Sequence, residues 1–284
     1  MAGAGLIVIK RRIKSVTNTK KITKAMGLVA SSKLRKVREK SSINNEYYNY
    51  LEEIKNMIVK SMDDNSNFFI KGNGKSKKLY VVFTSDSGLC GGYNVGIIGK
   101  ALEEIKKDKE ESLIMVLGQK GREYLNRFNY TTEAEYVELS DIPNASEAKT
   151  ISEHIENLFK CEKVGEVYLV YTKFISSIKQ DTVVEKFLPL DFNDENQNDD
   201  DFIFEPEKEE ILEDMISMYL KSKILNCLMS AKTSEHSARM TAMDGASRNA
   251  DDILEKLNIK YNRVRQSVIT QEISEIVGGA EAQK

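Results

Sequence analysis

The 284-residue sequence has no tryptophan, only three prolines and only three cysteines. Proline ends or kinks helices, so a chain this poor in proline has room for very long ones. Cys90, Cys161 and Cys227 are odd in number and far apart, which is typical of a reducing compartment and offers no metal-binding spacing. No apolar run approaches about 20 residues and no secretory leader is visible, so we expect a soluble chain that reaches a membrane only through partners.

The net charge is small, but the charged residues are distributed very unevenly along the chain. The formal net charge is −2, yet residues 1–40 contain twelve lysines and arginines and a single acid, Glu39. Residues 191–214 contain twelve acids and a single base, Lys208. Such asymmetry is typical of a partner-binding arm or a solvated tail.

Two stretches at opposite ends of the chain have the apolar spacing of very long helices. From about Leu6 to Asn67 there is no proline and one interior glycine, Gly27, which predicts a helix of roughly 85–90 Å. A second helix is predicted from Glu207 to about Ile276. The expected stripes include Ile9, Ile13, Val16, Ile22, Met26, Val29, Ala30, Leu34, Val37, Tyr47, Leu51, Ile54 and Ile58, then Leu220, Ile224, Cys227, Ala231, Ala246, Ala250, Ile253 and Leu257. We expect the two helices to pack antiparallel, because neither can bury its stripe alone.

The middle of the chain changes to alternating strands and helices. Buried strands are predicted in "KLYVVFT" (78–84), "SLIMVLG" and "EVYLVYTKFIS", with helices between them and a final hairpin. This order favours an α/β class with a small, largely parallel, Rossmann-like sheet. The expected parts are a first helix at 1–70, an inserted α/β domain at 76–190, an acidic linker at 191–206 and a second helix at 207–284.

A glycine-rich loop, "TSDSGLCGGYN" (84–94), lies between a predicted strand and a predicted helix, where phosphate-binding loops occur. It matches neither G-x-G-x-x-G nor G-x-x-x-x-G-K-[ST], so we interpret it as a structural turn and expect no cofactor and no metal. Cys90 has neither His154 nor His236 near it in sequence, so no catalytic group is predicted.

The end of the second helix is apolar over about half its circumference. One coiled-coil partner cannot cover so wide a face, so we expect other subunits to enclose it. The residues of this apolar tip are Val268, Ile269, Ile273, Ile276 and Val277.

Three motifs together resemble the γ subunit of F-type ATP synthases: "IKRRI…KITKAM" at the start, "TSDSGLCGGYN" in the middle and "YNRVRQSVITQEISEIVGGAEA" at the end. The resemblance is collinear along the whole chain. It implies a bacterial central rotor shaft with no catalytic role and no direct small-molecule substrate. The implied partners are three α and three β subunits, the ε subunit and the membrane c-ring, at the cytoplasmic face of the cell membrane.

Individual roles follow from the same resemblance. Met26 matches the shaft residue nearest the moving β lever, and the basic strip 20–37 would face acidic segments of the β subunits. Contacts to β-subunit loops are implied for Arg265, Gln266, Thr270 and Glu272, and contacts of the foot with the c-ring for Phe202, Phe204 and Glu205. The family usually has arginine at Ser87 and a larger residue at Gly27, and its photosynthetic members carry a cysteine pair that is missing here.

Two other functions are compatible with parts of the sequence. The basic first helix could track nucleic-acid phosphates as part of a coiled-coil scaffold, but it has no aromatic residue before Tyr47 and its apolar stripe favours a protein partner. A small nucleotide-binding enzyme is the other alternative. Nucleotide binding by the isolated chain would favour the enzyme, and steeply salt-dependent DNA or RNA binding would favour the scaffold.

Overall fold

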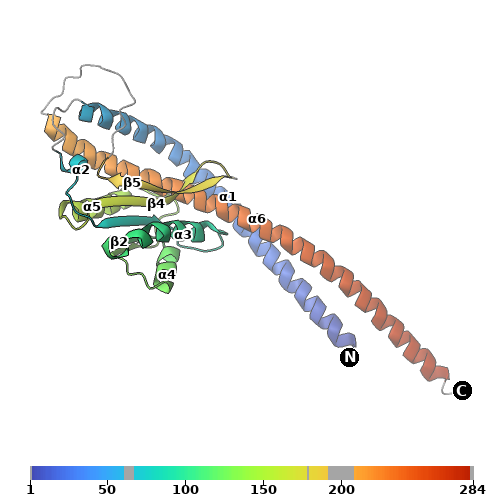
Figure 1. Ribbon diagram of the computed structural model, residues 1–284. Helices are drawn as coiled ribbons and strands as arrows, with labels where there is room; N and C mark the ends of the chain where they lie inside the picture. Colours follow the sequence, from blue (N-terminus) through green and yellow to red (C-terminus); the bar gives the residue numbers. More distant parts are fainter. Residues whose placement is uncertain (1, 61–66, 178, 191–207, 282–284) are drawn as a thin grey trace. The chain divides into compact units, whose positions relative to one another are not determined.

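The computed structural model describes residues 2–60, 67–177, 179–190 and 208–281. Two helices dominate it, α1 (Ala2–Lys60) with 59 residues and α6 (Lys208–Glu281) with 74 residues (Figure 1). The predicted pair of very long terminal helices is therefore confirmed. The expectation that the first helix reaches Asn67 is wrong. Asn67 instead caps a separate short helix, α2 (Phe68–Lys71), because its side chain accepts a hydrogen bond from the Phe69 amide.

The chain forms two compact units, and both long helices contribute to each. One unit contains the residues up to Ala30 and those from Arg239 onward, and the other contains Ser31–Ala238. The boundaries of these two units differ from those of the four parts expected from the sequence. The four-part division stays a prediction. The acidic linker and foot at 191–206 lie outside the described residues, and α6 begins after them at Lys208.

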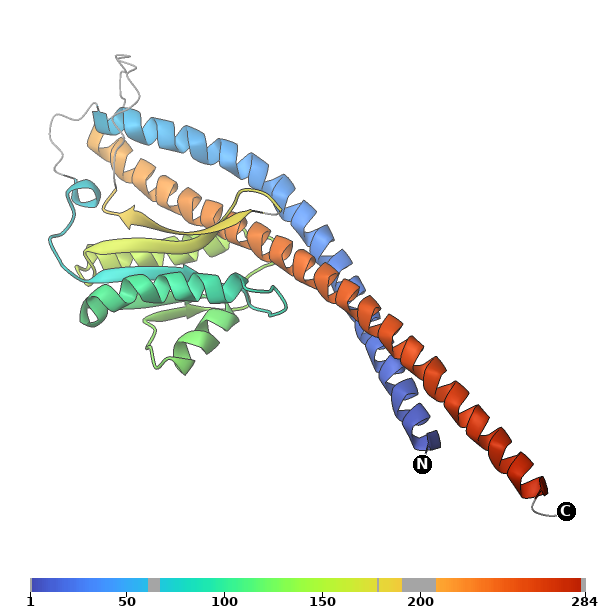
Figure 2. The ribbon, with the colours of Figure 1, turned by 45° about the vertical axis from the view of Figure 1, so that its right-hand side comes forward.

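The first unit is an antiparallel helix pair. Lys20 pairs with Asp251, and the Thr23 hydroxyl lies 2.8 Å from that of Ser247, so residue numbers rise along α1 as they fall along α6. Both views show the same arrangement (Figures 1 and 2). The burial of Ala250 confirms part of the predicted stripe. The residues Ile22, Val29 and Ile253 were expected in the stripes but are 60%, 54% and 44% exposed, because a single partner helix covers only a narrow seam.

The second unit contains the predicted α/β domain. Its five strands, in the order β3-β2-β1-β4-β5, form a sheet that is parallel except for the final β4–β5 hairpin. The strands are β1 (Lys78–Phe83), β2 (Ser112–Leu117), β3 (Ala134–Tyr136), β4 (Glu166–Phe174) and β5 (Gln180–Leu188). The largely parallel sheet and the final hairpin are both confirmed.

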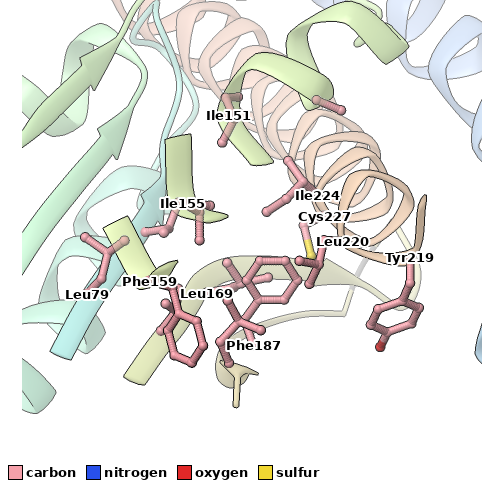
Figure 3. Packing of buried hydrophobic residues seen from close by; sticks show 14 of the residues in the cluster. Leu79, Ile151, Ile155, Phe159, Leu169, Phe187, Tyr219, Leu220, Ile224 and Cys227 are labelled. Atoms are coloured by element: carbon pink, nitrogen blue, oxygen red, sulfur yellow. The ribbon is translucent and has the colours of Figure 1, made fainter. Parts of the chain in front are cut away.

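Helices cover both faces of this sheet, as the near-continuous apolar strands require. The helices α3 (Tyr93–Ile105) and α4 (Gln119–Arg127) pack on one face, and α3 continues into a short 3-10 helix, η1 (Lys106–Glu111). The helix α5 (Ala145–Lys160) and the first half of α6 pack on the other face, where Phe159, Leu169 and Ile224 share one core (Figure 3).

In this unit α1 lies on the outer side of α6, and its buried face differs in part from the prediction. Ala231, Ile224 and Leu220 of α6 are buried as expected, and Tyr48 of α1 stacks on Tyr219 with ring centroids 5.8 Å apart. Of the expected α1 residues, Leu34, Val37 and Leu51 are buried. Tyr47 and Ile54 are 49% and 42% exposed, because the seam passes through Tyr48 and Leu51 and turns both side chains away from α6.

Candidate functional surfaces of the terminal helices

The end of α6 extends beyond the start of α1, so its last turns have no helix beside them (Figure 2). Ile273, Ile276 and Val277 are 57%, 72% and 53% exposed there. Val268 is half-buried and Ile269 is exposed. Burying one such side chain contributes about 1.5–3 kcal/mol, so this surface has a strong tendency to be covered by a partner.

The four polar residues expected to meet β-subunit loops are all exposed on α6 just before or within this tip. At about 100° per residue, Arg265 and Glu272 share one side of the helix, and Gln266 and Thr270 share an adjacent side. The Thr270 hydroxyl donates to the Gln266 backbone carbonyl at 2.9 Å, and Gln266 is exposed. The side with Arg265 and Glu272 is therefore charged, and the side with Gln266 and Thr270 is polar but uncharged.

The basic strip of α1 combines positive charge with exposed apolar surface. Lys21 and Lys24 are exposed, Met26 is half-buried, and Leu28 is 68% exposed beside them. Sequence reasoning had assigned the aliphatic residues here to the helix pair. The structure turns Ile22 and Val29 outward instead, so the strip combines positive charge with exposed apolar side chains.

A second exposed apolar row lies on α1, and the sequence pattern predicts two of its members, Tyr47 and Ile54, to be buried. Ile43, Tyr47, Tyr50, Ile54 and Met57 are all exposed and follow a 4-3-4-3 spacing. The signal was present, but the buried residues Tyr48 and Leu51 fall between the members of this row. Periodicity alone did not separate the two faces.

Polar groups of the glycine-rich loop form hydrogen bonds with one another and with neighbouring residues. The Asn94 side chain accepts from the Ser85 amide at 3.0 Å and donates to the Ser85 hydroxyl at 2.7 Å. The Thr84 hydroxyl donates to the Leu117 carbonyl and accepts from the Gly121 amide. A hollow of about 240 Å³ beside the loop is smaller than the roughly 300–1,000 Å³ of most ligand sites. These bonds support the structural interpretation of the loop.

Cys90, Cys227 and His154 fit structural roles as well. Desolvation raises the pKa of the fully buried Cys227 thiol to about 12, so it stays protonated at neutral pH. Cys90 is buried and receives a hydrogen bond from Asn94, and His154 is bonded to the Tyr136 hydroxyl at 2.8 Å. Among the described residues no group of side chains forms a metal site, and no described helix has the length and apolarity needed to span a membrane.

Comparison with known proteins places the whole chain in one family. Residues 5–283 match the family described as ATP synthase. The chain is 54% identical over 285 residues to the ATP synthase gamma chains of Clostridium novyi (strain NT) and Clostridium botulinum (strain Kyoto / Type A2), with full coverage of both chains in each case. The protein belongs to the ATP synthase gamma chain family. The family resemblance noted in the sequence is thus confirmed.

Solved structures share the gamma-chain fold. The chain resembles a chain of the Euglena gracilis mitochondrial ATP synthase rotor with a TM-score of 0.71 and 17% identity, covering 94% of this chain and 99% of that one. A chain of the Euglena gracilis OSCP/F1/c-ring structure gives a TM-score of 0.72 and 16% identity, with 99% and 95% coverage. The predicted fold, long terminal helices around an α/β domain, is therefore confirmed. Phe202, Phe204 and Glu205, the predicted foot contacts, lie outside the described residues.

Proposed function

We propose that this chain is the central rotor shaft of a bacterial F-type ATP synthase. It couples ion flow through the c-ring to sequential changes at the β-subunit sites. The observation that carries the proposal is the end of α6 in a chain of the gamma family, where an apolar tip is exposed beyond α1. Such a surface suits an axle end enclosed by an apolar sleeve of other subunits.

The mechanism is mechanical. The two helices present unlike sides: the basic strip around Met26 on α1, and the polar pairs of Arg265 with Glu272 and of Gln266 with Thr270 on α6. As the shaft turns, each β subunit meets these sides in sequence. Contacts that differ between the conformations of a β subunit shift their populations, so each nucleotide site cycles through different affinities.

The partners follow from this role. The shaft sits within three α and three β subunits, and its foot, with the ε subunit, meets the c-ring through Phe202, Phe204 and Glu205. The chain acts at the cytoplasmic face of the cell membrane without spanning it, catalyses no reaction and binds no nucleotide itself. The other subunits determine whether protons or sodium ions drive rotation.

Reconstitution tests the proposal. The α, β and ε subunits should co-purify with the chain, and membrane vesicles with the complete complex should pump ions when ATP is hydrolysed. Ala250 lies in the buried seam, so Ala250→Pro should kink α6 and cost about 3 kcal/mol or more. Ion pumping per ATP hydrolysed should then fall much further than hydrolysis.

The matched control is Asn249→Ala, which changes the adjacent, exposed position and preserves the helix. It should keep the wild-type ratio of pumping to hydrolysis. A complex that assembles normally with Ala250→Pro and keeps that ratio would show that α6 is not the coupling shaft.

A further inference from the structure

One segment of α6 breaks the usual rule for a buried helix. The six residues Lys232–Ser237 are all polar or charged, and each is 5% exposed or less. At about 100° per residue they occupy the whole circumference of the helix. A helix buried on every side is normally apolar, so these groups must be satisfied by specific partners.

Lys232 has its partner in the glycine-rich loop. Its ammonium lies 3.5 Å from Oδ2 of Asp86 and 3.2 Å from a carboxylate oxygen of Glu235. Oδ1 of Asp86 accepts hydrogen bonds from the amides of Gln119 at 3.1 Å and Glu138 at 2.9 Å. Asp86, Gln119 and Glu138 follow β1, β2 and β3, so one carboxylate joins the ends of three parallel strands to α6.

The end of β4 is attached to the same stretch of α6. The Ser234 hydroxyl donates to the Thr172 carbonyl at 3.1 Å, and the Ser230 hydroxyl accepts from the Phe174 amide at 3.1 Å. In open α/β sheets ligands bind beside the carboxyl ends of the strands, where the strand order reverses. The order here reverses between β1 and β4, and the polar stretch of α6 binds the residues at the ends of both strands.

The long helix α1 is tied to this edge as well. Lys33 lies 2.7 Å from Asp141 in the loop after β3. Burial works against the charge of Asp141, yet Lys33, with Lys232 and His236 nearby, holds its pKa below the usual value. Both terminal helices are therefore joined to the sheet by ion pairs at one edge.

Apolar packing and ion pairs restrain a helix in different ways. The core formed by α5, α6 and the sheet resists separation, and the hydrophobic effect that drives it is non-directional. A buried ion pair with additional hydrogen bonds has one productive geometry and can specify register. Asp86 and Lys232 form a largely buried pair with such hydrogen bonds, since their side chains are 23% and 7% exposed.

We propose that the Asp86–Lys232 pair is a positioning joint that transmits torque from the α/β domain into α6. It fixes the rotation of the helix against the sheet, so that movement of the α/β domain turns the shaft without slip. The proposal rests on the rotor function proposed above.

The test uses the complete complex in membrane vesicles, with ATP hydrolysis and ion pumping measured together. Asp86→Asn is the decisive variant, because the asparagine oxygen still accepts from both amides while the charge that the loop offers to Lys232 is removed and Glu235, on α6 itself, still faces Lys232. Asp86→Asn and Lys232→Met should each lower pumping per ATP hydrolysed at least about threefold, and the double variant should lose no more than either single one. Lys232→Arg should retain most of the coupling.

Lys120→Met is the matched control, since it removes a lysine of α4 whose ammonium pairs with Glu123 of the same helix. Wild-type coupling with Asp86→Asn, additive losses in the double variant, or an equal loss with Lys120→Met would each overturn the joint. If Ala250→Pro uncouples the complex and Asp86→Asn does not, only this inference fails. If wild-type vesicles do not couple at all, the rotor function itself fails.

Discussion

At the scale of single residues, Gly27 is a weak point inside α1 that packing does not require. A Cβ atom at this position would lie 3.5 Å from Cβ of Met243, which is an ordinary van der Waals contact. Glycine in a helix interior costs about 1 kcal/mol relative to alanine. The absence of a side chain therefore lowers local helix stability without relieving any clash.

We accordingly expect Gly27→Ala to stabilise the helix pair by roughly 0.5–1 kcal/mol. Amide hydrogen exchange in the assembled complex should slow severalfold around this position. Gly118→Ala is the contrasting variant, because its Cβ would lie 2.4 Å from the Thr84 carbonyl oxygen at a φ of +98°, and it should destabilise the α/β domain. Faster amide hydrogen exchange around residue 27 in Gly27→Ala would contradict the expected stabilisation of the helix pair.

A second residue-scale feature is the polar cluster between the hairpin and α6. Glu185 accepts from the Tyr171 hydroxyl at 2.8 Å and from Lys223 at 2.6 Å. Burial opposes the charge of Glu185, but Lys223 and Tyr171 together hold its pKa below the usual value of 4.5. A lowered carboxyl pKa gives stability that is present above the unfolded pKa and is lost as pH falls through the folded one.

We expect Glu185→Gln to be less stable than wild type near neutral pH, with the difference shrinking as pH falls below about 4.5. Thermal unfolding midpoints of both proteins across this range measure the effect. Glu53→Gln, at an exposed position of α1, is the control and should differ little from wild type at any pH. A difference between Glu185→Gln and wild type that does not change with pH would rule out the ion pair as its cause.

At the scale of elements, the end of α6 exposes apolar side chains that a partner subunit could bury. Ile276 is 72% exposed, so replacing it should hardly alter the stability of the chain itself. If other subunits enclose the tip in an apolar sleeve, an aspartate at position 276 would bury an unpaired charge in the complex, which is costly.

Ile276→Asp should therefore leave the unfolding midpoint of the isolated chain almost unchanged while weakening assembly with the α and β subunits. Co-purification yields and complex lifetime measure this effect. Ile276→Leu keeps the apolar character and should assemble normally. Equal assembly of the aspartate and leucine variants would show that the tip is not enclosed.

At the scale of the whole molecule, exposed apolar residues occur on both long helices, and α1 carries the row from Ile43 to Met57. Surfaces of this kind promote association. We expect the isolated chain to bind a hydrophobic dye and to self-associate at high concentration, and both effects to disappear in the assembled complex. Light scattering and dye fluorescence before and after adding the partner subunits test this expectation.

The sequence by itself determined the two long helices, the order of strands and helices between them, the hairpin and the family. Each depends on local signals: missing prolines, 4-3-4 and strand-like apolar patterns, and three specific motifs. It also indicated the α6 tip, because an apolar face wider than one seam is visible in the periodicity of Ile269, Ile273 and Ile276.

Which apolar residues are buried, and what the polar run 232–237 contacts, follow from the packing of the folded chain. Tyr47 and Tyr48 are adjacent and chemically alike, yet one is exposed and the other buried, because the position of α6 selects the seam. Asp86 and Lys232 are far apart in sequence, and their pairing arises when the parallel sheet brings its strand ends together against α6. Such contacts depend on the packing of distant segments, so no local pattern encodes them.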